Sequence, residues 1–92
     1  MKYKIKYTKK FKKDLRQAKK QGKDIEKLFE IIEKIAKDEA LDERYRDYSL
    51  TGNYKGVREC HIEPDFLLIY EKIDEVLVLS LVRTGSHSDL FK

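Results

Sequence analysis

The sequence predicts an α+β domain with the element order β-α-α-β-β-β, in which an N-terminal helical hairpin packs on an antiparallel sheet. Three observations predict this fold. A short stretch alternates charged and apolar residues, two stretches then repeat apolar residues at helical spacing, and three apolar runs separated by turn residues follow. Because 92 residues suffice for one modest core, we expect a single domain over residues 1–92.

The N-terminal part of the chain predicts one strand and two helices. Residues 2–7 alternate lysines with Tyr and Ile, as in a half-buried strand with a charged outer face. Thr8 can cap a helix over residues 9–20, and a second amphipathic helix follows over residues 24–38. Gly22 lies in a short link between them, which predicts that the two helices are antiparallel.

The C-terminal part predicts a loop and then a meander of three strands. Residues 39–55 carry the weakest pattern, which indicates a long loop with one helical turn. The run Val76–Val82 is apolar on both faces, so it should be an interior strand. A short turn of helix is expected at residues 86–90. The strands and their turns are expected at residues 57–62, 63–65, 67–70, 72–75 and 76–82.

The charge of the chain is distributed unevenly along its length. The net charge is +4, but residues 1–37 hold 14 Lys and Arg against 5 Asp and Glu, a net +9, whereas residues 38–92 hold 7 against 12, a net −5. This asymmetry indicates either a basic surface for a polyanion or a helix face that is only solvated.

The only cysteine, Cys60, cannot form an internal disulfide, which is typical of a reducing cytosol. We expect Cys60 to be a small core residue rather than a nucleophile. No apolar run is long enough to cross a membrane, and the N-terminus lacks the apolar segment of a signal peptide. The sequence therefore predicts a soluble cytoplasmic protein with no membrane contact.

Four side chains with suitable chemistry are predicted to converge at one edge of the sheet. His61 ends one strand, Asp65 lies in the turn after it, Arg83 follows the last strand opposite Phe66, and His87 comes just beyond. Histidine exchanges protons near its ordinary pKa of about 6.5, and arginine binds phosphate with two hydrogen bonds. These are the groups that metal-independent cleavage of RNA requires, through attack of the 2′-hydroxyl on the scissile phosphate.

Two other interpretations of the same residues remain. His61 could be a surface histidine beside a turn, and the two histidines with one aspartate could bind zinc. A zinc site usually shows a third strong ligand or a compact pair of ligands, and the sequence contains neither. We therefore expect no metal and no cofactor.

The sequence also resembles a known family. The runs His-Ile-Glu-Pro-Asp-Phe-Leu-Leu-Ile-Tyr and Arg-Thr-Gly-Ser-His-Ser-Asp-Leu-Phe are similar to the C-terminal half of YafQ-type toxins, which belong to the RelE superfamily of bacterial type II toxin–antitoxin systems. The resemblance covers residues 47–91. Over residues 1–45 it is restricted to a lysine-rich helical hairpin after a first strand.

The resemblance implies an activity and partners. Toxins of this family enter the ribosomal A site and cut messenger RNA there, and a cognate antitoxin silences them. The expected function is therefore a ribosome-dependent endoribonuclease whose partners are an antitoxin protein, the ribosome with its ribosomal RNA, and messenger RNA. Two alternatives stay open: a gyrase-poisoning toxin of the same fold, which needs no paired histidines, and an inactive module that binds RNA or antitoxin.

The resemblance also implies roles for individual residues. His61 and Asp65 would act on the 2′-hydroxyl, His87 would act as an acid or phosphate contact, and Arg83 would stabilise the transition state. Tyr48 stands where well-known members carry a catalytic histidine. A phenol with a pKa near ~10 is a poor base, but it can donate a hydrogen bond. The expected RNA contacts are Phe91, Phe66 (where the family often has tryptophan), Lys55, Arg58, Lys9, Lys10, Lys12 and Lys13.

Overall fold

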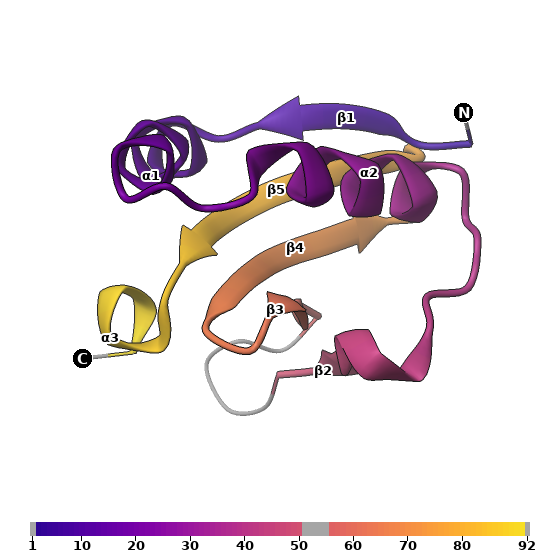
Figure 1. Ribbon diagram of the computed structural model, residues 1–92. Coiled ribbons are helices and arrows are strands. Elements are labelled where there is room, and N and C mark those ends of the chain that lie inside the picture. The colour runs from indigo at the N-terminus through magenta and orange to yellow at the C-terminus, as the bar shows by residue number, and fades with distance from the viewer. Residues whose placement is uncertain (1, 51–55, 92) are drawn as a thin grey trace.

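Five strands form one mixed sheet in the order β1-β5-β4-β3-β2 (Figure 1). The computed structural model describes residues 2–50 and 56–91. Strand β1 pairs parallel with β5, and the other three pairings are antiparallel. The α+β fold is therefore confirmed, with one parallel pairing in a sheet expected to be wholly antiparallel. The strands are β1 Lys4–Tyr7, β2 Tyr48–Ser49, β3 Arg58–Glu63, β4 Phe66–Ile73 and β5 Val78–Gly85.

The two expected helices are present and begin at the expected caps. The Thr8 hydroxyl and the Asp24 carboxylate accept hydrogen bonds from the first turns of α1 and α2, at 3.1 and 3.0 Å. Figure 1 shows α1 along its axis and α2 from the side, so the helices cross instead of lying antiparallel. The helices are α1 Lys9–Lys20, α2 Ile25–Ala36, the 3₁₀ turn η1 Glu43–Tyr45 and α3 His87–Leu90.

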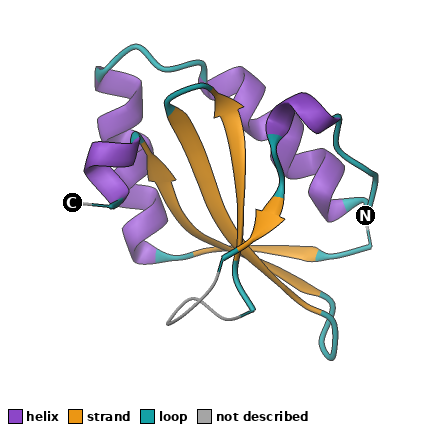
Figure 2. Ribbon diagram, turned by 90° about the horizontal axis from the view of Figure 1, so that it is seen from below, coloured by secondary structure: helices purple, strands orange, loops and turns teal. Residues whose placement is uncertain are grey.

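The core lies between the sheet and the two long helices, with strand β4 at its centre. The first five residues of β4, Phe66 to Tyr70, are all buried. Cys60 is fully buried in this core, as expected, and burial raises the pKa of its thiol. In both ribbon views α3 lies at the same end of the sheet as α1 (Figures 1 and 2). Within the described residues, no helix combines the length and the apolar character that crossing a bilayer requires.

The second hairpin turn lies further along the chain than the sequence predicted. Strand β4 continues to Ile73, which pairs with Val78, so residues 74–77 form the turn. Val76 and Leu77, expected in the strand, are 65% and 44% exposed. Of the residues expected in the turn, Lys72 and Ile73 belong to β4 instead, and Lys72 forms an ion pair with Asp38 at 3.0 Å.

Strand β2 was not predicted, and side-chain hydrogen bonds hold it in place. The Arg58 guanidinium donates to the Asp47 carboxylate at 3.1 Å and to the Ser49 hydroxyl at 2.9 Å. The Tyr70 hydroxyl donates to the same Asp47 carboxylate at 2.7 Å. Strand β2 has only two residues in the sheet, so its own backbone pairing is short. The side-chain hydrogen bonds therefore add to that pairing by fixing Asp47 and Ser49, the residues on either side of Tyr48.

We predict that Arg58→Met lowers the free energy of unfolding by about 1–3 kcal/mol, since hydrogen bonds to the partly exposed Asp47 carboxylate are lost. Urea denaturation measures the change. Arg16→Met is the matched control, because Arg16 is exposed on α1. Equal stability of the two variants would show that Arg58 does not hold β2.

Candidate active site

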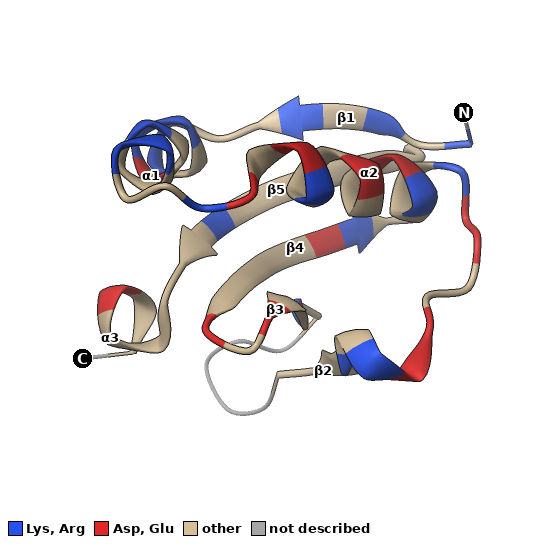
Figure 3. Cartoon of the chain, in the orientation of Figure 1, with Lys and Arg blue, Asp and Glu red and all other residues tan. Residues whose placement is uncertain are grey.

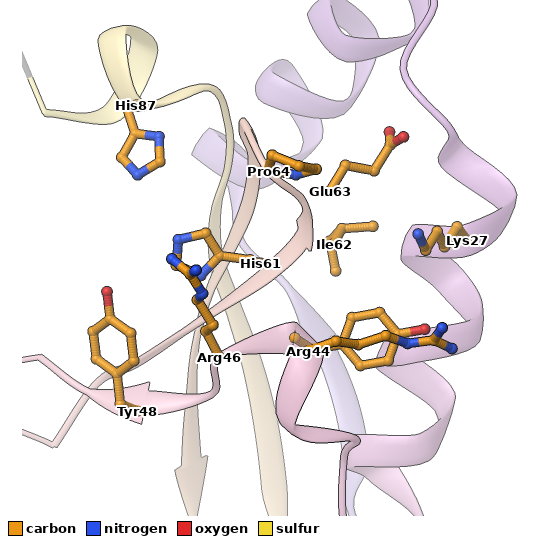
Figure 4. Close-up of a pocket in the computed structure, with 10 residues that line it drawn as sticks. Lys27, Arg44, Arg46, Tyr48, His61, Ile62, Glu63, Pro64 and His87 are labelled. Carbon is orange, nitrogen blue, oxygen red and sulfur yellow. The ribbon is translucent and has the colours of Figure 1, made fainter.

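An open pocket of about 540 Å³ lies beside strand β3, between α2, η1 and the turn after β3 (Figure 4). Three residues that can donate or accept protons come from separate elements: His61 from β3, His87 from α3 and Tyr48 from β2. The pocket is lined by Lys27, Arg44, Tyr45, Arg46, Tyr48, His61, Ile62, Glu63, Pro64 and His87.

Asp65 and His87 form the best-defined polar contact of the site. Asp65 lies in the turn after β3, and its Oδ1 accepts the backbone N–H of His87 at 3.0 Å and lies 2.8 Å from the ring Nδ1. The backbone N–H of His87 and then its ring hold the pKa of the Asp65 carboxyl below its ordinary value. The ionised carboxylate accepts a hydrogen bond from the Nδ1–H of His87, which leaves Nε2 of His87 to exchange protons.

His61 lies between Tyr48 and His87. Its ring centroid is 5.7 Å from that of His87 and 6.2 Å from that of Tyr48. The side chain is 9% exposed, and Nδ1 is buried with no hydrogen-bond partner in the described part of the chain. A buried N–H without an acceptor is costly, so this environment favours the tautomer that carries its hydrogen on Nε2. His61 is then a hydrogen-bond donor.

Tyr48 is 48% exposed on β2, opposite Glu59 of β3. The interaction of its hydroxyl with the Glu59 carboxylate is the main reason that the pKa of Tyr48 lies above its ordinary value. The phenol therefore stays protonated near neutral pH. This environment is consistent with a hydrogen-bond donor and unfavourable for a general base.

Three cations of the pocket were not identified from the sequence. Arg44 and Arg46 flank Tyr45 in and after the turn η1, and Lys27 comes from the first turn of α2. Arg46 has a left-handed backbone, with φ 45°, which for a non-glycine residue costs roughly 1–2 kcal/mol. The one available signal was the pair of arginines just before Tyr48, inside the segment with the weakest secondary-structure pattern.

Arg83 does not lie where the sequence placed it. It pairs with Ile69 in the sheet, not with Phe66, because the hairpin turn lies further along the chain than predicted and the register also shifts between Ile69 and Tyr70. Its guanidinium binds the Asp14 carboxylate of α1 at 2.6 and 3.1 Å. Arg83 therefore lines a separate groove beside α1, and the expected cluster of four contains only His61, Asp65 and His87.

The expected RNA contacts are not all accessible. Phe66 is 1% exposed in the core, so its ring is not placed to stack on a base, and that interpretation is corrected. Arg58 is engaged by Asp47 and does not line the pocket. Phe91 is 39% exposed at the end of α3, and Lys55 lies outside the described residues. The exposed lysines of α1 form a basic surface (Figure 3): Lys9, Lys10, Lys12 and Lys13.

No metal centre is evident in the described segments, since none of their His, Cys, Asp and Glu side chains form a group of three that could hold an ion. The site is thus a basic pocket with two histidines, one of which is oriented by a carboxylate. Such a set can bind a phosphate, donate hydrogen bonds to it and transfer protons at Nε2 of His87.

Comparisons with known proteins identify relatives over nearly all of the chain. Residues 3–92 match the family described as a bacterial toxin of type II toxin–antitoxin systems, YafQ. The mRNA interferase toxin YafQ of Escherichia coli K12 is 47% identical over 47 residues, which are 51% of this chain and 49% of that protein. In this alignment the chain spans about half the length of the curated relative it matches.

Solved structures extend the similarity to the full domain. YafQ from E. coli BL21(DE3) is 35% identical, with 98% of this chain and 99% of that chain covered and a TM-score of 0.91. The E. coli DinJ–YafQ complex is 35% identical, with complete coverage of both chains and a TM-score of 0.89. A metal-bound toxin from Helicobacter pylori is 42% identical, with 97% and 99% covered and a TM-score of 0.91. The chain belongs to the YafQ family of toxins of type II toxin–antitoxin systems.

Proposed function

We propose that this protein is an endoribonuclease toxin that cuts messenger RNA on the ribosome. The observation that carries the proposal is the Asp65–His87 pair, whose imidazole lies beside His61 in a pocket that also holds three cations. Curated E. coli relatives named mRNA interferase toxins support the same activity.

The proposed reaction needs only side chains and the RNA. A base removes the proton of the 2′-hydroxyl, O2′ attacks phosphorus, and the bond from phosphorus to O5′ breaks. An acid protonates O5′, so the products are a 2′,3′-cyclic phosphate and a 5′-hydroxyl. DNA lacks the attacking hydroxyl and would not react.

His87 is the proposed proton-transfer residue. One Asp65 carboxylate oxygen accepts hydrogen bonds from the backbone N–H and from the ring Nδ1 of His87, so Nε2 is the nitrogen that can exchange a proton. This assignment revises the sequence-based one, in which Asp65 acted on the 2′-hydroxyl together with His61. Asp65 becomes the residue that orients His87.

His61, Tyr48 and Arg46 are the proposed phosphate ligands. His61 and Tyr48 are placed as hydrogen-bond donors, for the reasons of burial and pKa given above. Arg46 replaces Arg83 as the cation beside the scissile phosphate, because the Arg83 guanidinium is bound by Asp14. Donors placed in advance around the developing charge stabilise the transition state.

The proposed partners are the ribosome and an antitoxin. The exposed lysines of α1 can contact phosphates of ribosomal RNA, and a toxin with this fold is bound by the antitoxin DinJ in E. coli. Antitoxin binding would silence the activity by competing for the toxin.

We predict that His87→Ala slows cleavage by ~10²–10⁴, the usual contribution of a positioned acid or base. The assay is cleavage of a defined message on programmed ribosomes, with the new 5′ ends mapped. Ser88→Ala is the matched control, since Ser88 is exposed on the same short helix and does not line the pocket. Cleavage at the wild-type rate by folded His87→Ala protein would exclude the proposed role.

Substitutions of Tyr48 test its role as a donor. We predict that Tyr48→Phe loses one hydrogen bond to a charged group, about 1.5–3 kcal/mol, and so slows cleavage by about one to two powers of ten. Tyr48→His should keep or raise activity, since the imidazole can also donate. The cleavage rate and the melting temperature are measured together. A silent Tyr48→Phe combined with an unstable Tyr48→His would mean that Tyr48 only packs.

A further inference from the structure

We propose that Lys27 and Arg44 form a second phosphate site, which binds the phosphodiester next to the one that is cleaved. The inference rests on the proposed function, because it takes RNA as the occupant of the pocket. In this proposal the rim formed by α2 and η1 positions the RNA strand, while the cleavage chemistry takes place at His61 and His87.

The geometry of Tyr45 carries the proposal. The Lys27 Nζ lies 5.7 Å and the Arg44 Cζ 5.0 Å from the centroid of the same Tyr45 ring. That ring is itself buried, at 9% exposed, so it is a fixed support for both cations. Contact with an aromatic face restrains a long basic side chain without neutralising its charge. The pair therefore keeps two positive charges in defined places.

The charge balance at this rim supports an anionic ligand. Lys27 and Arg44 form no ion pair with a carboxylate in the described part of the chain, whereas Arg58 and Arg83 do. Among the residues that line the pocket, Glu63 is the single carboxylate against three cations. The carboxylates of Asp24, Glu26 and Glu30 line an adjoining hollow together with the same two cations. They would repel RNA there, so the favourable path for a strand runs from the two cations toward the histidines.

The arrangement of the pocket separates two phosphate positions. Figure 4 shows His61 and Arg46 between His87 on one side and Arg44 and Lys27 on the other. A phosphate beside His61 and Arg46 is the one that reacts. Lys27 and Arg44 are therefore placed for a neighbouring phosphate of the same strand and not for the leaving group.

The test uses a short RNA with a 2′-O-methyl group at the cleaved nucleotide, which prevents the reaction. Affinity for the isolated protein is measured for the wild type, Lys27→Gln and Arg44→Gln. A matched control is Lys34→Gln, because Lys34 lies two turns further along α2, is exposed and does not line the pocket. In further RNAs, one phosphate at a time is replaced by an uncharged methylphosphonate.

We expect each pocket variant to weaken binding about tenfold, as for one charge-assisted hydrogen bond in a partly exposed site, and the control to be unchanged. One methylphosphonate next to the cleaved position should weaken wild-type binding by a similar factor. With that RNA the pocket variants should bind as the wild type does, because the contact is already lost.

Three results would overturn the site. The first is that the wild type does not bind this RNA. The second is that Lys27→Gln and Arg44→Gln bind as tightly as the Lys34→Gln control. The third is that the loss of affinity in these two variants adds to the loss caused by the methylphosphonate, whichever phosphate is replaced. Reduced affinity for the antitoxin with unchanged affinity for RNA would assign the two cations to a protein partner instead. Cleavage of unmodified message on ribosomes is measured separately, so the proposed function can fail while phosphate binding is still observed.

Discussion

The contact between Asp65 and His87 is the interaction on which the site depends. It joins the turn after β3 to the N-terminus of α3, which are 22 residues apart in the chain. Gly85 makes the junction possible, because at its φ of 153° a Cβ atom would lie 3.3 Å from the Asp89 side chain. Asp89 in turn forms a capping box with Ser86, which begins the helix that carries His87. Backbone geometry and one carboxylate therefore decide where the imidazole points.

The residues brought together by this contact were predictable from the sequence. The turn at Pro64 and the short helix after Gly85 are local features, and both have sequence signals. The position of Arg83 depends on where the hairpin turn before β5 lies and on a bulge in β5, and no residue pattern marks that bulge. Phe66 was misassigned because its side chain lies in the core cluster with residues of both long helices, such as Phe11 and Leu28.

The placement of Arg46 and Tyr48 at the pocket could not be predicted from the periodicity of the sequence. Residues 39–50 contain one 3₁₀ turn and two residues of strand, which are too short for a repeating pattern. Their placement depends on long-range hydrogen bonds from Arg58 and Tyr70 to Asp47. Arg46 and Tyr48 reach the pocket only because that tertiary contact fixes the chain on either side of them. Because its guanidinium makes this contact, Arg58 stabilises the fold.

The central claim is that the site cleaves RNA through the 2′-hydroxyl of the substrate. The most direct measurement uses a message with a single 2′-deoxy nucleotide on the 5′ side of the scissile phosphate, on programmed ribosomes, with the termini of the products analysed. We predict no cleavage at that position, and a 2′,3′-cyclic phosphate on the upstream product of the unmodified message. Cleavage of the deoxy-substituted message at the normal rate would contradict it.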